Sequence, residues 1–269
     1  MKKKIILILM LIIATSLIVS CGSGEILNPE ENNNNNQNVD NNKKVSDFDD
    51  DYEIINYYIS HIHTYYCYTI TEVGQTDASK GGFSYTQKIN SEVKKINNQY
   101  SFVDETSSSL VNNKHEAYFE DDNVKYKNSS DKEFIEVSLS DYKKKYGVAP
   151  SDVCLFGASF KKEGIKEINH TYDEETKEYT FNIFLDGEIV ATNMKIQAKE
   201  FGSLQDYPKY QSLNVTLVIK DNFEPVKATI TSEYTISVFL LGEMNCKQVL
   251  NEVFSNIKLN EDNDGKDRK

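Results

Sequence analysis

Residues 66–73 read YCYTITEV and carry the pattern that decides the fold class. Their large side chains, Tyr66, Tyr68 and Ile70, alternate with threonines. Alternation with a period of two is typical of a β-strand that buries one face. The same alternation continues in residues 83–96, after a turn that contains two glycines. We therefore expect a sheet in which Tyr66, Tyr68 and Ile70 share the buried face.

Further alternating segments follow at short intervals along the chain. They are residues 100–111, 115–119, 124–126, 134–137, 165–172, 178–185, 213–219, 226–240 and 247–257. The turns between most of them are too short for the crossover connections that parallel strands require. The sequence therefore predicts an antiparallel meander.

Helical patterns are fewer than strand patterns. Residues 49–62 place apolar side chains at helical spacing, with acidic residues in the first turn, which predicts an amphipathic helix. Residues 140–146 predict a second helix, with Ser140 as its N-cap, and residues 150–156 a further turn. Residues 189–201 are compatible with helix or strand. The expected fold class is α+β and mostly β.

The composition limits the class of protein. The chain has 269 residues, of which 39 % are hydrophobic, enough for the core of one large domain. Its 42 acidic residues outnumber 30 basic ones, for a net charge of −12, and its single arginine is Arg268. This balance excludes nucleic acid as the expected partner, since a polyanion needs a basic surface.

The first twenty residues have the layout of an export signal. Lys2, Lys3 and Lys4 precede an apolar run, and the small Ser20 precedes Cys21. This order is typical of a secretory signal peptide. By length alone, a transmembrane anchor stays an alternative.

The residues Ile18-Val19-Ser20-Cys21 resemble the lipobox of bacterial lipoproteins. The resemblance implies that the chain is cut before Cys21, and that Cys21 carries diacylglycerol and palmitate-type acyl chains. The expected partner is thus the membrane, with the protein held outside the cytoplasmic membrane. We divide the chain into a signal peptide (1–20), a lipidated disordered tether (21–46), one antiparallel-sheet domain (47–259) and a disordered tail (260–269).

A lipidated domain with an initial helix and many long strands is similar to the lipoproteins built on a curved half-barrel sheet. These include the carrier of the Lol sorting pathway and mycobacterial lipid-binding lipoproteins. The resemblance implies a curved antiparallel sheet covered by an N-terminal helix and one or two helical insertions. It also implies an apolar cavity for acyl chains.

Candidate metal ligands are sparse. His61 and His63 would share one face of an extended segment, but His115 and His170 lie at no recognisable ligand spacing. In the tail, Asn260, Asp262, Asp264 and Gly265 match part of a calcium loop, without its final bidentate acid. We expect no metal site.

Three cysteines remain beside Cys21. Cys67 and Cys154 have aromatic or apolar neighbours, whereas Cys246 stands between Asn245 and Lys247. We expect Cys67 and Cys154 to be buried and Cys246 to be the most accessible thiol. Whether any two of them form a disulfide stays open.

Enzymatic motifs are absent from the sequence, including the GxSxG elbow, the HExxH helix, the Walker loop and the dinucleotide glycines. We expect a non-enzymatic protein without a cofactor or catalytic residue, which binds or carries an apolar or amphiphilic ligand. The alternative is a surface structural or protein-interaction module with a solid core. The ligand-binding residues and the oligomeric state stay unknown.

Overall fold

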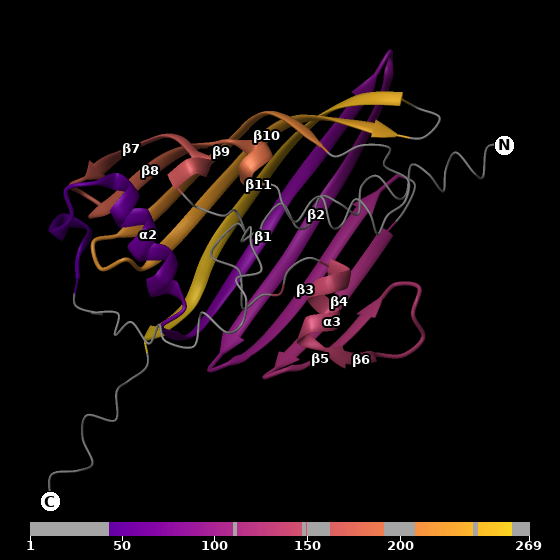
Figure 1. Ribbon diagram of the computed structural model, residues 1–269, viewed down its shortest axis with the longest axis horizontal. Helices are drawn as coiled ribbons and strands as arrows, with labels where there is room; N and C mark the ends of the chain where they lie inside the picture. The colour runs from indigo at the N-terminus through magenta and orange to yellow at the C-terminus, as the bar shows by residue number, and fades with distance from the viewer. Residues whose placement is uncertain are drawn as a thin grey trace, which may run out of the picture.

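The computed structural model describes residues 43–109, 112–146, 149, 162–190, 208–238 and 242–259. Its strands form one open antiparallel sheet of 11 strands, which is long, twisted and curved (Figure 1). Helices are few, and they lie on one side of the sheet (Figure 1). The expected fold class, mostly β with a curved half-barrel sheet, is confirmed.

The elements follow each other with short turns along most of the chain. The first half contains η2 (Val45–Asp47), α2 (Asp51–Ile62), β1 (Tyr65–Lys80), β2 (Phe83–Ile96), β3 (Gln99–Ser108), β4 (Asn112–Glu120), β5 (Asn123–Asn128), β6 (Ile135–Ser138) and α3 (Leu139–Tyr146). The second half contains η4 (Lys162–Gly164), β7 (Ile165–Asp173), β8 (Glu178–Leu185), α4 (Gly187–Val190), β9 (Lys209–Lys220), β10 (Pro225–Val238) and β11 (Gly242–Leu259).

The sheet joins two meanders through one long-range pair. Its spatial order is β6-β5-β4-β3-β2-β1-β11-β10-β9-β8-β7. Every other pair joins strands consecutive in the chain, as the short turns predict, whereas β1 pairs with β11 from the opposite end. The first and last strands therefore lie at the centre of the sheet.

Helix α2 covers one face of the sheet, which we call the inner face. Asp50 caps the helix, because its Oδ1 accepts a hydrogen bond of 3.0 Å from the backbone N–H of Glu53. Ile55, Tyr58 and Ile62 are buried at the spacing the sequence predicts. They form one core with inner-face residues of β1, β8, β9, β10 and β11.

Helix α3 covers the β4–β6 end of the same face, but its cap differs from the prediction. Ser138, not Ser140, caps it: the Oγ of Ser138 accepts a 3.1 Å hydrogen bond from the N–H of Asp141. The same hydroxyl donates to the Asp141 carboxylate at 2.9 Å. The predicted cap was wrong because Leu139 already belongs to the helix.

Tyr66 does not share the buried face with Tyr68 and Ile70, contrary to the alternation in the sequence. Its side chain is 40 % exposed, whereas Tyr65 is buried. The pairing of β1 with β11 is irregular between Tyr65 and Thr69. Such an irregularity shifts the side-chain alternation by a residue, which no periodic pattern reveals.

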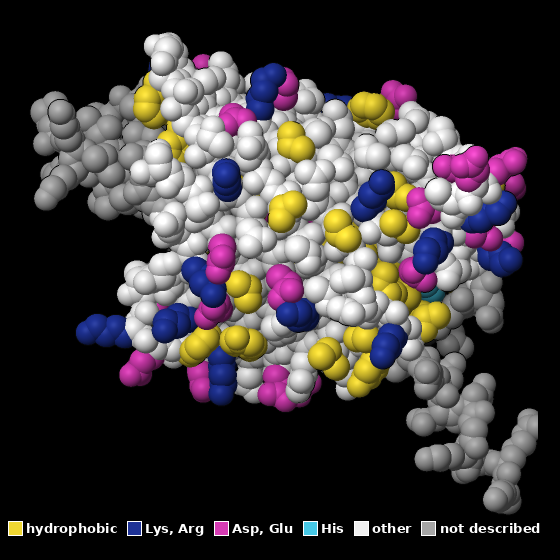
Figure 2. Space-filling model, turned by 180° about the vertical axis from the view of Figure 1, so that it is seen from behind, with side chains coloured by type: hydrophobic (Ala, Val, Ile, Leu, Met, Phe, Trp, Pro, Cys, Tyr) yellow, Lys and Arg dark blue, Asp and Glu magenta, His cyan; other side chains and the backbone are white. Residues whose placement is uncertain are grey.

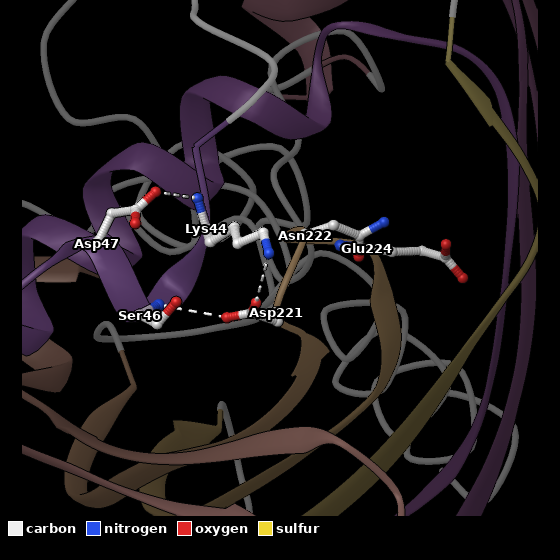
Figure 3. A network of polar contacts seen from close by, with 6 residues as sticks. All are labelled: Lys44, Ser46, Asp47, Asp221, Asn222 and Glu224. Carbon is white, nitrogen blue, oxygen red and sulfur yellow. Dashed lines mark hydrogen bonds and ion pairs between the residues drawn. The ribbon is translucent and has the colours of Figure 1, made fainter.

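Residues 43–48 lie against the β9–β10 turn, although 43–46 fall within the stretch predicted as tether. The backbone N–H of Val45 donates to the carbonyl of Asp221 at 2.8 Å, and that of Ser46 to the Asp221 carboxylate at 3.3 Å. Lys44 Nζ lies 3.9 Å from the same carboxylate, and its backbone N–H donates to Asp47 (Figure 3). The side chain of Val45 is buried. These contacts tie the start of the described chain to the sheet.

Candidate ligand-binding site on the inner face of the sheet

A row of polar side chains crosses the centre of the inner face. Glu252 of β11 pairs with Glu72 of β1, Glu72 with Ser91 of β2, and Ser91 with Asp104 of β3. All four residues are at most 8 % exposed. We call these four residues the carboxyl row, because three buried carboxyl groups distinguish it from the rest of the inner face.

Apolar side chains flank the carboxyl row toward α2. Phe254, Ile70, Val93 and Phe102 occupy consecutive positions on the same four strands, one inward-facing step away. Phe254 and Ile70 belong to the main core around α2, Val93 packs against that core, and Phe102 packs against a second core under α3.

On the other side, the next row is formed by Leu250, Gly74, Ile89 and the buried Thr106. Leu250 and Ile89 are buried. Carboxyl groups between two such rows have little access to water. Burial of this kind strongly disfavours the charged form of an acid.

Hydrogen bonds link the members of the carboxyl row. Ser91 Oγ lies 2.8 Å from Asp104 Oδ1 and 3.4 Å from Glu72 Oε1. Glu252 and Glu72, which face each other on adjacent strands, also share a side-chain hydrogen bond. Oε2 of Glu252 is buried and has no hydrogen-bond partner among the described residues.

Burial keeps these acids protonated to a higher pH than carboxyl groups that are exposed to water. Desolvation raises the pKa of Glu72 to about 7, although hydrogen bonds from Ser91 and Glu252 lower it in part. Desolvation also raises the pKa of Glu252, and the neighbouring Glu72 charge raises it further. The pKa of Asp104 is raised for the same main reason. At neutral pH the row therefore holds protons that a bound cation would displace.

His115 continues the line of the row on β4, opposite Asp104. Its Nδ1 lies 2.9 Å from Asn128 Oδ1, and its Nε2 lies 2.8 Å from the Tyr142 hydroxyl of α3. With the amide oxygen as acceptor, Nδ1 carries the proton and Nε2 accepts from Tyr142. Desolvation lowers the pKa of His115. His115 is thus neutral, and its two hydrogen bonds connect α3 to the sheet; we call this arrangement the His115 clamp.

The other histidines are scattered over the structure. His61 is buried at the end of α2 and His63 is exposed at its C-cap, so the two do not share the face of an extended segment. His170 Nδ1 lies 2.6 Å from the carboxylate of Asp51, which ties β7 to the start of α2. The structure therefore does not bring the four histidines together.

The expected order of thiol accessibility was wrong. Cys246 is 2 % exposed, whereas Cys67 is only partly buried, with its Sγ 3.1 Å from the carbonyl oxygen of Asn256. Asn245 and Lys247 are exposed because neighbours in a strand point to the opposite face. Cys246 itself points inward, and Cys154 lies outside the described residues.

Cys21 and the tail residues Asn260, Asp262, Asp264 and Gly265 also lie outside the described residues. The predicted lipid-attachment site therefore stays a prediction. Within the described part of the chain, no helix combines the length and the apolar character needed to cross a membrane.

The carboxyl row was not predicted from the sequence, although one signal for it exists. Glu72 has the same parity as Tyr68 and Ile70 in its strand, which places a carboxyl group on the buried face. The alternation does not show which face of its strand Glu252 occupies. Apolar residues stand at odd positions, Val249 and Val253, and also at even positions, Leu250 and Phe254. The meeting of Glu72 and Glu252 depends on the long-range pairing of β1 with β11.

No family model and no curated protein matches the chain. Solved structures with some likeness include the ywiB protein of Bacillus subtilis, with 7 % identity over 72 % of this chain and 98 % of that one, at a TM-score of 0.22. A DUF1329 family protein of Desulfovibrio piger has 9 % identity over 76 % of this chain and 90 % of that one, at a TM-score of 0.25. A putative outer membrane lipoprotein-sorting protein domain of Vibrio parahaemolyticus has 9 % identity over 76 % of this chain and 92 % of that one, at a TM-score of 0.24. Likenesses with such TM-scores identify neither a family nor a function for this chain.

Proposed function

We propose that this protein is an exported lipoprotein, anchored to the membrane through acyl chains on Cys21, that binds an amphiphilic ligand on the inner face of its sheet without catalysis. The anchor rests on the basic start, the apolar run and the lipobox-like residues before Cys21. Two or more acyl chains give the stable anchoring that one chain does not provide. The acidic chain would itself be repelled by anionic lipid heads.

The carboxyl row is the observation that carries the binding function. A sheet that serves only as a solid scaffold is best filled with apolar side chains, since buried carboxyl groups cost free energy. Here three of them lie in one line between apolar rows. An amphiphile presents this same combination of a polar head and apolar chains.

The test is to make the full chain in a lipid-containing host and to identify extracted lipids by mass spectrometry. We expect a lipid in stoichiometric amount, reduced in the Glu72→Gln/Glu252→Gln variant. Glu243→Gln is the matched control, because Glu243 is an exposed acid of the same strand as Glu252. A native protein that carries no lipid, and binds no amphiphile added to it, would refute the proposal.

Acylation is tested separately with labelled fatty acid. The wild-type chain should incorporate the label, and Cys21→Ala should not. Label in the Cys21→Ala protein would show that the anchor is elsewhere.

The outer face supports a second candidate function, that of a protein-interaction module. Hydrophobic side chains are spread between charged ones over this face (Figure 2). Ile96 is 57 % and Tyr118 is 48 % exposed, and both line a shallow groove of about 390 Å³. Photo-cross-linking from position 118 in intact cells tests this function. A defined adduct that Ile96→Lys removes, with bound lipid unchanged, would favour it.

A further inference from the structure

The carboxyl row is an extended line of acceptors. Its four residues lie on four adjacent strands, which are spaced by about 4.8 Å in a sheet. Glu252 and Asp104 are thus separated by roughly 14 Å of sheet, whereas Glu252 and Glu72 are direct neighbours. The pair Glu72–Glu252 is the part of the row where two carboxyl groups converge.

No described cationic side chain forms an ion pair with the three acids of the row. The neighbouring lysine of the inner face, Lys95, lies at the α2 end, where Nζ donates to the His63 carbonyl at 2.8 Å. It also faces the Tyr68 and Tyr100 rings. Glu105 adds negative charge near Asp104, and His115 is neutral in its clamp. Buried carboxyl groups usually have a cationic or metal partner.

Glu252 supplies a second observation. Oε2 of this carboxyl group is buried and unpaired among the described residues, although Glu72 lies directly opposite on the neighbouring strand. A buried acceptor without a donor costs free energy. A ligand with N–H donors would satisfy this atom and Glu72 together.

We propose that the Glu72–Glu252 pair binds the ammonium group of a cationic amphiphile, whose hydrocarbon chain lies along the apolar rows that flank the carboxyl row. This inference rests on the proposed function and specifies the head group of its ligand. An ammonium group has three N–H donors and no acceptor, which matches a site made of carboxyl oxygens. Asp104, linked to Glu72 through Ser91, extends the line of carboxyl oxygens beyond this pair.

Other head groups fit the site less well. An anionic head would be repelled once Glu72, whose pKa is raised to about 7, loses its proton. A calcium ion needs six to eight oxygens around one point, and the row presents its carboxyl groups along a line. The pKa of Glu72, raised to about 7, implies that binding of a cation releases a proton to solvent. Affinity for an ammonium head should therefore rise with pH.

The experiment is isothermal titration calorimetry on the full acylated chain in nanodiscs, with empty nanodiscs as the blank. The probes are octylammonium, octanoate and octanol, each at about pH 6 and about pH 8. We expect octylammonium to bind preferentially, at least about tenfold more tightly at the higher pH, with a heat that depends on the buffer because protons are released. Glu72→Gln/Glu252→Gln should lose about tenfold or more, and Glu243→Gln should bind normally.

The outcomes separate the two proposals. If octanoate or octanol binds as tightly as octylammonium, or if affinity for the amine falls with pH, the ammonium site is wrong while amphiphile binding stands. If calcium chloride alone gives a heat of binding and also displaces octylammonium, the site binds a metal ion and the ammonium proposal is wrong. If no probe binds and no lipid co-purifies, amphiphile binding itself is refuted. Circular dichroism of the variants establishes that each is folded.

Discussion

Gly74 of β1 lies directly opposite Leu250 of β11, and Leu250 occupies the space that a side chain at position 74 would need. A Cβ at this position would lie 2.3 Å from the Val249 carbonyl oxygen and 2.7 Å from Leu250 Cδ2. These distances leave no room for a methyl group. The central strand pair therefore depends on a glycine that has no unusual backbone angle.

Gly74→Ala should destabilise the sheet at its central strand pair. Overpacking of this kind costs typically about 1–3 kcal/mol, and here a backbone atom is involved, so the loss should be at least that. Chemical denaturation measures it. Ser79→Ala, at an exposed position of the same strand, is the control and should change stability little. Equal stability of the two variants would contradict the close contact.

The free energy of unfolding should fall as the pH rises through neutrality. The pKa of Glu72 is raised in the folded protein from 4.5 to about 7, so its contribution is fully present below about 4.5 and is lost as the pH rises through 7. The loss is on the order of 2–3 kcal/mol. Denaturation at about pH 5 and about pH 8 measures it. Glu72→Gln/Glu252→Gln should flatten this dependence, whereas Glu243→Gln should keep it.

Alkylation of the native protein should modify Cys67 before Cys246. Burial raises the pKa of the Cys246 thiol to about 12, which leaves almost no thiolate at neutral pH. Cys67 is only partly buried. Peptide mass spectrometry after brief treatment with iodoacetamide, with and without denaturant, gives the order. Modification of Cys246 in the folded protein would show that β11 opens there.

Tyr142→Phe should destabilise the attachment of α3 to the sheet. It removes the hydroxyl that donates to His115 Nε2, and leaving a buried acceptor unpaired costs about 1–3 kcal/mol. Because burial lowers the pKa of His115, the stability that depends on its neutral form is present above pH 6.5 and is lost as the pH falls.

NMR titration of the His115 ring measures this pKa in both proteins. A His115 ring that titrates as in a free peptide would contradict the buried clamp.

Local patterns in the sequence predicted most elements of the fold. The alternation in residues 83–96 and 178–185 predicted β2 and β8 with their observed bounds. The apolar spacing of residues 49–62 predicted α2. Each of these patterns arises within one element, from the period of its own backbone. The cap of α3 was missed because a serine was available at both 138 and 140.

The sequence by itself determined that strands dominate, that consecutive strands pair antiparallel, and that residues before 21 resemble an export signal. The tertiary structure alone decided which strands meet at the centre of the sheet. Pairing β1 with β11 places Glu72 opposite Glu252, Gly74 opposite Leu250, and Cys246 opposite Ala78. At least 168 residues separate the members of each such pair. Because contacts at that distance depend on register and not on local periodicity, the buried carboxyl row, the glycine contact and the inaccessible thiol became apparent only in the folded chain.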